Sequence, residues 1–249
     1  MSRLAAVASV LSAILAAAAP AQALIGAEPD GRFADRVVMV LLRGGGEAGF
    51  CSGLVIDPRT VLTAAHCLKP PTDMAVFYRN ADGAPVIVAV DRAIAHPGYR
   101  PDAIRSRVRS IDVALLRTAR ALDPRFSAAV IGATDQPTVG DRVVLSGYGV
   151  TRDGDWKSGG TLRSVTLSVR EPASPVLVWA AQADGKAGGA CSGDSGAPFW
   201  SEDGGTAVAI ATWAQAPHGR GCGGLTQGPR LAPLRAWIEA AAARLRGAR

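Results

Sequence analysis

Short apolar runs separated by turn residues recur along most of this chain, and this spacing constrains the fold more than any other feature. In Val165–Val169 apolar residues alternate with polar ones, which is the period-two pattern of a half-buried strand. Pairs such as Asp57-Pro58 and Asp82-Gly83 separate neighbouring runs. The other runs are Val37–Leu42, Leu54–Ile56, Met74–Tyr78, Val86–Val90, Val113–Leu116, Val143–Leu145, Val176–Trp179 and Val208–Ala211. The pattern predicts an all-β fold, built as antiparallel barrels or as a sandwich.

The two ends of the chain differ from this pattern. Residues 1–23 combine an early Arg3, an apolar run and a closing Ala21-Gln22-Ala23, which is typical of a signal peptide and its cleavage site. After Pro233, apolar and alanine residues at helical spacing predict a C-terminal helix over 233–246. We therefore expect a mature chain of 24–249, with two halves at about 24–130 and 131–232.

Charge and histidine content narrow the range of partners. The formal net charge is +6, but no aromatic residues interleave with the arginine runs in the manner of single-strand binders. We therefore expect no nucleic-acid partner and interpret the arginines as solvated charge. With three histidines and no CxxC pair, the sequence predicts no metal site, and nothing in it calls for a cofactor.

The four cysteines fit the same exported context. An even number of cysteines in an oxidising compartment predicts two disulfides. Spacing alone leaves three pairings open.

Candidate catalytic groups of three types follow one another along the chain. Hydrolysis of a peptide by a serine requires a base for the hydroxyl, a buried carboxylate to hold that base, and N–H donors for the oxyanion. His66 lies in VLTAAHC, Asp112 lies among apolar neighbours in SIDVALL, and Ser195 lies in ACSGDSGAP. The glycines flanking Ser195 allow a tight turn, so Gly193 and Ser195 would supply the two oxyanion donors.

The segments TAAHC, DVALL and GDSGAP resemble the three signature segments of the trypsin/chymotrypsin-like serine protease family, in that family's order. The resemblance extends from Leu24 to the C-terminal helix. SGYG at 146–149 is similar to the family's SGWG turn, and ATWA at 211–214 is similar to a segment that lines the substrate cleft. The resemblance implies two six-stranded antiparallel β-barrels with the site between them. It also implies a Ser195 nucleophile, a His66 general base and an orienting carboxylate on Asp112.

The same resemblance implies the disulfide pairing. Cys51 and Cys67 match a family bridge that flanks the histidine, and Cys191 and Cys222 match one that flanks the substrate pocket. The segment of this chain that corresponds to the family's calcium loop contains few acidic residues, so we expect no bound calcium ion.

Activation is a further implication. Family members expose a hydrophobic N-terminus, whose amino group inserts beside the acid that precedes the catalytic serine. That acid is Asp194 here, and cleavage after Ala23 would expose the start LIGA, which resembles the family's IVGG. We expect the ammonium of Leu24 to pair with Asp194, so that export and activation are one event.

Substrate preference depends on the predicted pocket, which comprises Gly189, Ala190, Thr212, Trp213 and Ala214. In the family, an aspartate six residues before the nucleophile selects a basic P1 residue, the residue just before the cleaved bond. Gly189 occupies that position, so we expect P1 to be small or medium and apolar. A larger pocket of chymotrypsin type is the second interpretation.

Together these features predict a bacterial endopeptidase that is secreted or periplasmic, is processed at export, and acts as a monomer on proteins or peptides. We expect no stable membrane anchor after removal of the signal peptide. The alternative from a different class is an inactive homologue that binds peptides or polyanions.

Overall fold

The computed structural model describes residues 24–44, 46–106, 108–132, 136–217 and 219–247. The predicted signal peptide, residues 1–23, lies outside the described residues. The strands of the first half are β2 (Val37–Gly44), β3 (Glu47–Asp57), β4 (Thr60–Thr63), β5 (Met74–Arg79), β6 (Pro85–Ala95) and β7 (Ala114–Thr118). The remaining strands are β1 (Glu28–Pro29), β8 (Val130–Ile131), β9 (Arg142–Gly147), β10 (Arg163–Val169), β11 (Leu177–Ala181), β12 (Pro198–Ser201), β13 (Thr206–Ile210), β14 (Trp213–Ala214) and β15 (Thr226–Pro229).

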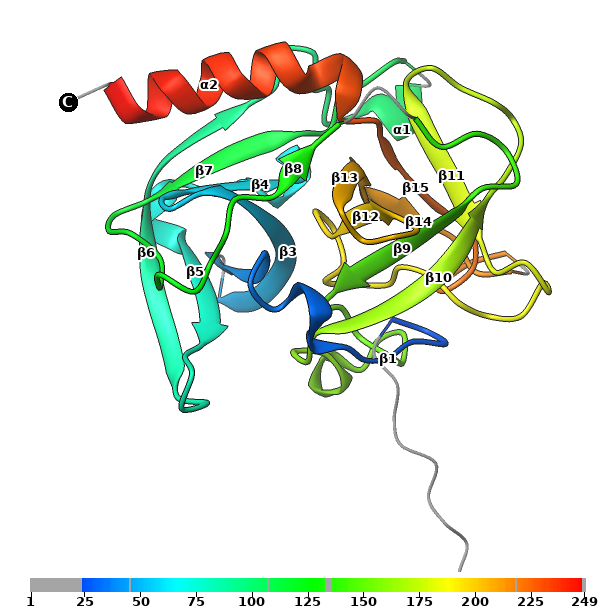
Figure 1. Ribbon diagram of the computed structural model, residues 1–249, viewed down its shortest axis with the longest axis horizontal. Helices are drawn as coiled ribbons and strands as arrows, with labels where there is room; N and C mark the ends of the chain where they lie inside the picture. The colour runs from blue at the N-terminus through cyan, green and yellow to red at the C-terminus, as the bar shows by residue number, and fades with distance from the viewer. Residues whose placement is uncertain (1–23, 45, 107, 133–135, 218, 248–249) are drawn as a thin grey trace, which may run out of the picture.

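The first half forms a closed barrel of six strands in the order β2-β3-β4-β7-β6-β5 (Figure 1). Every neighbouring pair in this barrel is antiparallel. Alternate side chains point inward, because successive residues of a strand face opposite sides of the sheet. Val38, Val40, Val61, Val76 and Leu116 are fully buried in this interior. The predicted first barrel is therefore confirmed.

The second half forms a nine-stranded sheet. Its central strands, β15-β11-β10-β9-β12-β13, are antiparallel to their neighbours. An isolated antiparallel bridge between Ala209 and Arg230 brings β13 beside the end of β15, which curls the sheet back on itself. Three short strands are added to these six, and one of them, β8, runs parallel to β13. The second barrel of the prediction thus has additional strands, because the crossing segment and the start of the described chain pair with its strands.

A shared core joins the two halves. Leu54 and Leu62 from the first barrel lie in one buried cluster with Trp200 and Ile210 from the second sheet. The rings of Phe33 and Trp200 stack within it, with centroids 4.7 Å apart. Strand β4, which precedes His66, and strand β12, which follows Ser195, contribute Leu62 and Trp200 to this core, so the core fixes the relative positions of the two residues.

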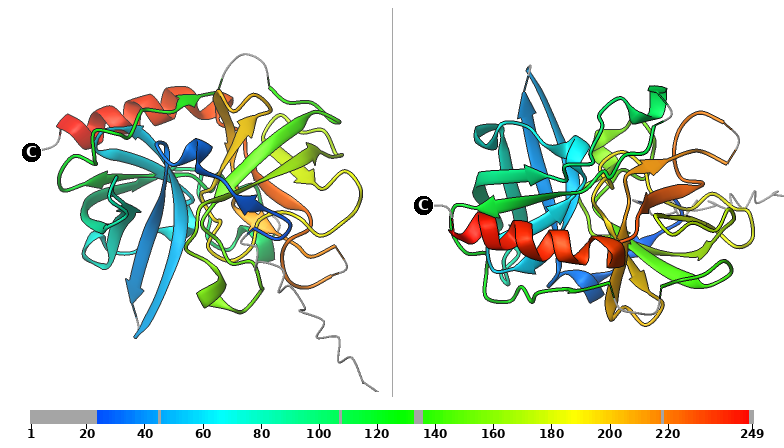
Figure 2. Two further views of the ribbon diagram at one scale, coloured as in Figure 1. Left: turned by 60° about the horizontal axis from the view of Figure 1, so that its bottom comes forward. Right: turned by 90° about the horizontal axis from the view of Figure 1, so that it is seen from above.

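The C-terminal helix α2 (Arg235–Gly247) lies across the first barrel, on the side of β6 and β7 (Figures 1 and 2). A 3-10 turn, Ala232–Leu234, leads into it, and Ile238, Ala241 and Leu245 on one face of the helix are buried. The prediction of a terminal helix is confirmed, with a start two residues later than expected because the proline sits in the preceding turn. The only other α-helix among the described residues is α1 (Ala103–Ser106), and no described helix is long and apolar enough to cross a membrane.

Candidate active site

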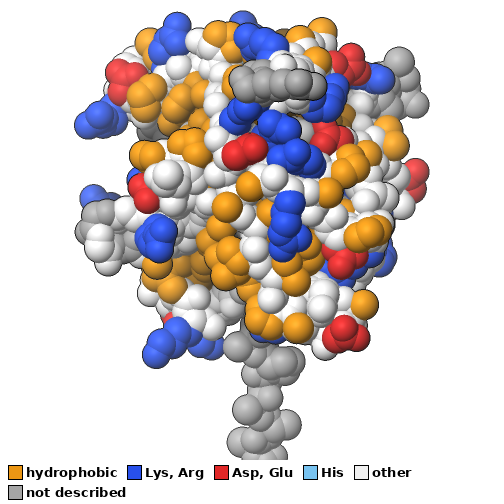
Figure 3. Space-filling view, turned by 90° about the vertical axis from the view of Figure 1, so that its left-hand side faces the viewer, with side chains coloured by type: hydrophobic (Ala, Val, Ile, Leu, Met, Phe, Trp, Pro, Cys, Tyr) orange, Lys and Arg blue, Asp and Glu red, His pale blue; other side chains and the backbone are white. Residues whose placement is uncertain are grey.

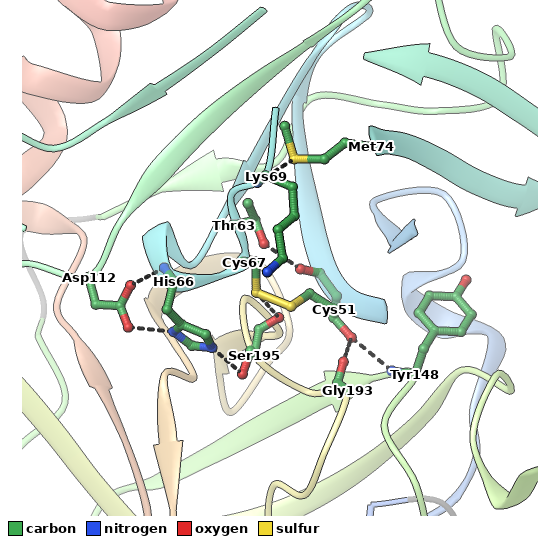
Figure 4. Close-up of a disulfide and its surroundings, with 11 residues drawn as sticks. Cys51, Thr63, His66, Cys67, Lys69, Met74, Asp112, Tyr148, Gly193 and Ser195 are labelled. Carbon is green, nitrogen blue, oxygen red and sulfur yellow. Dashed lines mark hydrogen bonds and ion pairs between the residues drawn. A yellow bond between two sulfur atoms is a disulfide. The ribbon is translucent and has the colours of Figure 1, made fainter. Parts of the chain in front are cut away.

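His66, Asp112 and Ser195 form one hydrogen-bonded line between the two halves (Figure 4). Nδ1 of His66 lies 2.6 Å from Oδ2 of Asp112, and Nε2 lies 2.8 Å from Oγ of Ser195. The backbone N–H of His66 also donates to Oδ1 of Asp112 at 2.9 Å. The carboxylate therefore holds both the ring and the backbone of the histidine. In this geometry Nε2 can accept a proton from the serine hydroxyl.

Local structure explains why these side chains meet. His66 lies in a 3-10 turn, Ala65–Cys67, which follows β4 directly. Asp112 lies two residues before β7, and β7 is hydrogen-bonded to β4 in the barrel. The side chain of His66 is 37% exposed and that of Asp112 is 20% exposed, so the imidazole is reachable while the carboxylate is more enclosed.

The loop before β12 presents Ser195 in a tightly constrained backbone. Gly193 and Gly196 have φ angles of +94° and +85°, a region in which side chains are strained. The N–H of Gly196 donates to the carbonyl of Ala211 at 2.7 Å. Within the described part of the chain, the N–H groups of Gly193 and Ser195 donate to no partner. Two unpaired donors beside a serine hydroxyl are the arrangement that an oxyanion would require.

Ser52 is a functional candidate that sequence reasoning missed. Its side chain is fully buried, its N–H donates to the carbonyl of Ser195 at 2.8 Å, and its hydroxyl donates to the carbonyl of Gly193 at 3.0 Å. The same hydroxyl accepts the N–H of Tyr148 at 3.0 Å. Ser52 thus ties the first barrel to the loop of Ser195. The bond from the Ser52 hydroxyl to Gly193 alone spans 141 residues of sequence, so no local pattern indicates these contacts.

Asp194 is fully buried, and its carboxylate accepts N–H groups from Gly149 at 2.8 Å and from Cys191 at 3.0 Å. Burial raises its pKa to about 7, and the two hydrogen bonds lower that pKa only in part. Leu24 is also fully buried, in one apolar cluster with Ala190 and Ala197. The described chain therefore places the side chain of Leu24 among residues close in sequence to Asp194. In the chain that still carries residue 23, the nitrogen of Leu24 belongs to a peptide bond and is not an amino group.

Both disulfides implied by the sequence resemblance are present. Cys51 is bonded to Cys67 next to the histidine, and Cys191 is bonded to Cys222, with sequence separations of 16 and 31 residues. Two groups of possible metal-ligating side chains occur among the described residues, and each contains one of these disulfides. Disulfide sulfurs are not the thiolates that bind zinc, so neither group suits a metal ion.

A cleft of about 710 Å³ opens beside the histidine. Its lining includes His66 and Asp112, the predicted pocket residues Thr212 and Trp213, and further residues that sequence reasoning missed. Among the latter are Tyr99, Arg100, Arg109, Val176, Leu177, Gln227 and Pro229. Burial, assisted by the negative charge of Asp112, raises the pKa of Tyr99. The cleft could hold an extended peptide segment beside the serine.

The other predicted pocket residues, Gly189, Ala190 and Ala214, do not line this cleft. Ala214 pairs with Thr226 across β14 and β15, and Thr226 is fully buried. The Thr226 hydroxyl accepts the N–H of Ala190 at 2.8 Å, and a Cβ on Gly189 would lie 2.6 Å from that oxygen. Thr226 therefore occupies the space at the base of the predicted pocket.

Comparisons with known proteins agree with this geometry. The family model described as Trypsin matches residues 28–238. Glandular kallikrein-10 of Rattus norvegicus is 27% identical over 187 residues, which cover 67% of this chain and 71% of that protein. Granzyme C of Mus musculus is 33% identical over 184 residues, which cover 67% of this chain and 68% of that protein.

Solved structures with the same fold include GrC and an inactivated protease paralogue of the scabies mite. GrC superimposes with a TM-score of 0.73 at 23% identity, over 88% of this chain and 99% of that one. The mite paralogue superimposes with a TM-score of 0.69 at 22% identity, again over 88% and 99%. At these identities the structures show the fold alone, whereas the family model matches by sequence and spans the triad positions. The chain therefore belongs to the trypsin family of serine endopeptidases.

Proposed function

We propose that this protein cleaves peptide bonds with Ser195 as nucleophile, His66 as general base and Asp112 as the carboxylate that orients the base. The observation that carries this proposal is the continuous hydrogen-bonded line of the three side chains beside the unpaired N–H groups of Gly193 and Ser195. None of the three positions is substituted by a residue that lacks the required chemistry.

In the proposed mechanism, Oγ of Ser195 attacks the carbonyl carbon of the substrate while Nε2 of His66 takes the hydroxyl proton. The two free N–H groups stabilise the negative oxygen of the tetrahedral intermediate. His66 then gives its proton to the leaving amine, which leaves an acyl-enzyme on Ser195. Water activated by the same histidine hydrolyses this ester, and Asp112 stabilises the imidazolium that forms in each half of the reaction.

For specificity, the proposal is a small or medium apolar P1 residue. Gly189 provides no carboxylate to pair with a basic side chain, and such a pair would be the main source of selectivity for arginine or lysine. Thr226 supports the choice of a small residue, because its buried side chain limits the depth available beside Gly189. A panel of peptides that differ only at P1 tests this, and strong cleavage after arginine or lysine would contradict it.

For maturation, the proposal is that removal of residues 1–23 on export exposes the amino group of Leu24, which then pairs with Asp194. The burial of Leu24 beside Ala190 supports this, as does the buried Asp194, which has no cationic partner among the described residues. Loss of one partner of a buried ion pair costs several kcal/mol, roughly 3–5. A chain that retains residues before Leu24 should therefore have much lower activity than the chain that begins at Leu24.

The alternative is an inactive relative that binds peptides or polyanions. Lys and Arg side chains are scattered over the face shown in Figure 3, with acidic side chains among them, rather than gathered in one band. A polyanion site would favour a continuous basic surface. The complete triad favours catalysis over this alternative.

The deciding experiment uses the chain of residues 24–249 on casein and on fluorogenic peptides with alanine at P1. We expect turnover that is lost in Ser195→Ala, together with stoichiometric labelling of Ser195 by a fluorophosphonate. Ser192→Ala is a suitable control, because Ser192 is an exposed serine in the same loop. A correctly folded, correctly processed protein that neither turns over peptides nor reacts with the probe would overturn the proposal.

A further inference from the structure

Arg230 is a buried cation without a counter-ion. Only 8% of its surface is exposed, and it forms no ion pair with any described residue. Its Nε donates to the carbonyl oxygens of Ser174 at 2.8 Å and Leu177 at 3.2 Å, whereas its Nη1 is buried with no hydrogen-bond partner. Burying an unpaired charge is costly, and burial accordingly lowers the pKa of Arg230. A group with this environment is suited to receive an anion.

The side chain of Arg230 lines a cavity of about 360 Å³ together with a second arginine, Arg109. Arg109 is exposed and has no ion pair or hydrogen bond among the described residues. The rest of the lining is mainly apolar, with Val176, Pro229 and Pro233 among its members. Two guanidinium groups in a mostly apolar cavity favour a carboxylate, to which Arg230 would offer its unpartnered Nη1 and Arg109 its guanidinium.

This cavity adjoins the active-site cleft. Arg109, Val176 and Pro229 line both the cleft beside His66 and the smaller cavity with Arg230. A peptide lying in the cleft would therefore pass the entrance of the cavity. Arg100 adds a further positive charge to the cleft, and it is held in place by the carbonyl oxygens of Pro97 and Tyr99, each 3.0 Å from its Nη1.

We propose that the cavity between Arg109 and Arg230 is a subsite for an acidic side chain of the substrate, at a fixed distance along the peptide from the cleaved bond. This inference rests on the proposed endopeptidase function and adds a second determinant to the apolar P1 preference. The substrate class is a peptide with a small apolar residue at the cleavage point and an aspartate or glutamate at one other position.

The test is a scan of peptides that share one alanine cleavage point. Each peptide carries glutamine at the other positions, and glutamine is replaced by glutamate at one position at a time, on both sides of the cleaved bond. We expect one position at which glutamate raises kcat/KM by on the order of tenfold or more, as for a hydrogen bond between charged groups. Because the two residues are nearly the same size, this ratio reports charge, and it should fall as salt is added.

Two variants connect the ratio to the cavity. Arg109→Gln should bring the glutamate-to-glutamine ratio close to one. Because Arg109 also lines the cleft, the ratio of the two peptides within this variant, rather than kcat/KM for either peptide alone, is the readout. Arg230→Met should have the same effect on the ratio, although loss of its bonds to Ser174 and Leu177 can lower stability. Arg105→Gln removes an equal charge from an exposed position outside both linings and should leave the ratio unchanged.

The outcomes separate the two proposals. If no peptide is cleaved, the proposed function itself fails. If the all-glutamine peptide is cleaved but glutamate gives no advantage at any position, the subsite is overturned while the endopeptidase function stands. A glutamate preference that persists in Arg109→Gln and in folded Arg230→Met would also overturn the subsite.

Discussion

At the scale of single residues, the site depends on groups that lie next to the reacting atoms without touching the substrate. Ser52 is the strongest example, because one hydroxyl contacts both the carbonyl of Gly193 and the N–H of Tyr148. The triad alone does not fix the direction of the Gly193 peptide. Ser52 does so from the opposite half of the molecule, which makes it a positioning residue for the candidate oxyanion donors.

Ser52→Ala should lower kcat while changing KM little. The change leaves the buried N–H of Tyr148 without its acceptor and releases the Gly193 carbonyl, at a cost of about 1–3 kcal/mol in the free energy of unfolding. Steady-state kinetics and urea denaturation of the same preparation measure the two effects. Ser106→Ala, at an exposed serine in α1, is the control. An unchanged kcat in Ser52→Ala would show that this hydroxyl does not position the loop.

Thr226→Gly should enlarge the primary pocket. Removing the buried side chain opens space beside Gly189, so the kcat/KM ratio for phenylalanine over alanine at P1 should rise about tenfold or more, the scale on which apolar pockets discriminate. Thr226→Ser keeps the hydroxyl that accepts the N–H of Ala190 and should shift the ratio far less. A ratio that is the same in Thr226→Gly and the unmodified protein would place the P1 side chain elsewhere.

At the scale of elements, the sequence predicts strands well where apolar and polar residues alternate or form a clear apolar run, and poorly where they do not. The alternating segment Val165–Val169 lies within β10, and the run Met74–Tyr78 lies within β5. By contrast, β12 and β15 contain proline or glycine and acquire their strand geometry from long-range pairing. β8 lies in the segment expected only to cross between halves, and its two residues pair because β13 offers a free edge.

The residues of the candidate site also divide into those that a local sequence pattern predicts and those that it does not. Its reactive side chains are predictable, because each lies in a short segment whose chemistry is local. The roles of Thr226 and Arg230 are not predictable in this way, because they come from pairing with β14 and from burial against a loop distant in sequence. Local patterns contain no information about such contacts.

Helix α2 should stabilise the first barrel mainly through its buried face. Ile238→Ala should lower the free energy of unfolding by about 2–5 kcal/mol, because Ile238 is only 2% exposed and its removal leaves a cavity between the helix and the core. Arg244→Ala, on the exposed face of the same helix, should change it by less than about 0.5 kcal/mol. Equal losses in the two variants, measured by urea denaturation, would mean that α2 is held by its charges rather than by packing.

At the scale of the whole molecule, three distant parts of the chain meet at one junction. Gly149, from the turn after β9, donates to Asp194 in the loop of Ser195, and Leu24, from the start of the described chain, is buried with Ala190 and Ala197 of that same loop region. Asp194 is the only one of these that titrates, so the state of the N-terminus should be detectable as a pH dependence of stability.

For the chain that retains residues 1–23, the direction in which stability changes with pH follows from the raised pKa of Asp194, which is about 7 against an ordinary 3.8. The folded state then binds a proton that the unfolded state releases from about pH 4 upward. The favourable contribution of this carboxyl is complete below pH 3.8 and is lost as pH rises toward and through 7. A folded-state pKa of about 7 in place of 3.8 corresponds to roughly 4 kcal/mol of stability across that range.

In the chain that begins at Leu24, an ammonium beside Asp194 would favour the charged carboxylate. Stability would then no longer be lost as pH rises toward 7. Denaturation by urea from pH 4 to pH 8 should therefore show stability falling in the uncleaved chain and falling much less in the processed one. Ser195→Ala in both chains prevents self-cleavage during the measurement. Asp194→Asn should flatten the pH profile of the uncleaved chain, because the group that titrates is gone. Parallel profiles for the two chains, each with Asp194 intact, would mean that the amino group of Leu24 does not reach this carboxylate, and activation would then require another cation.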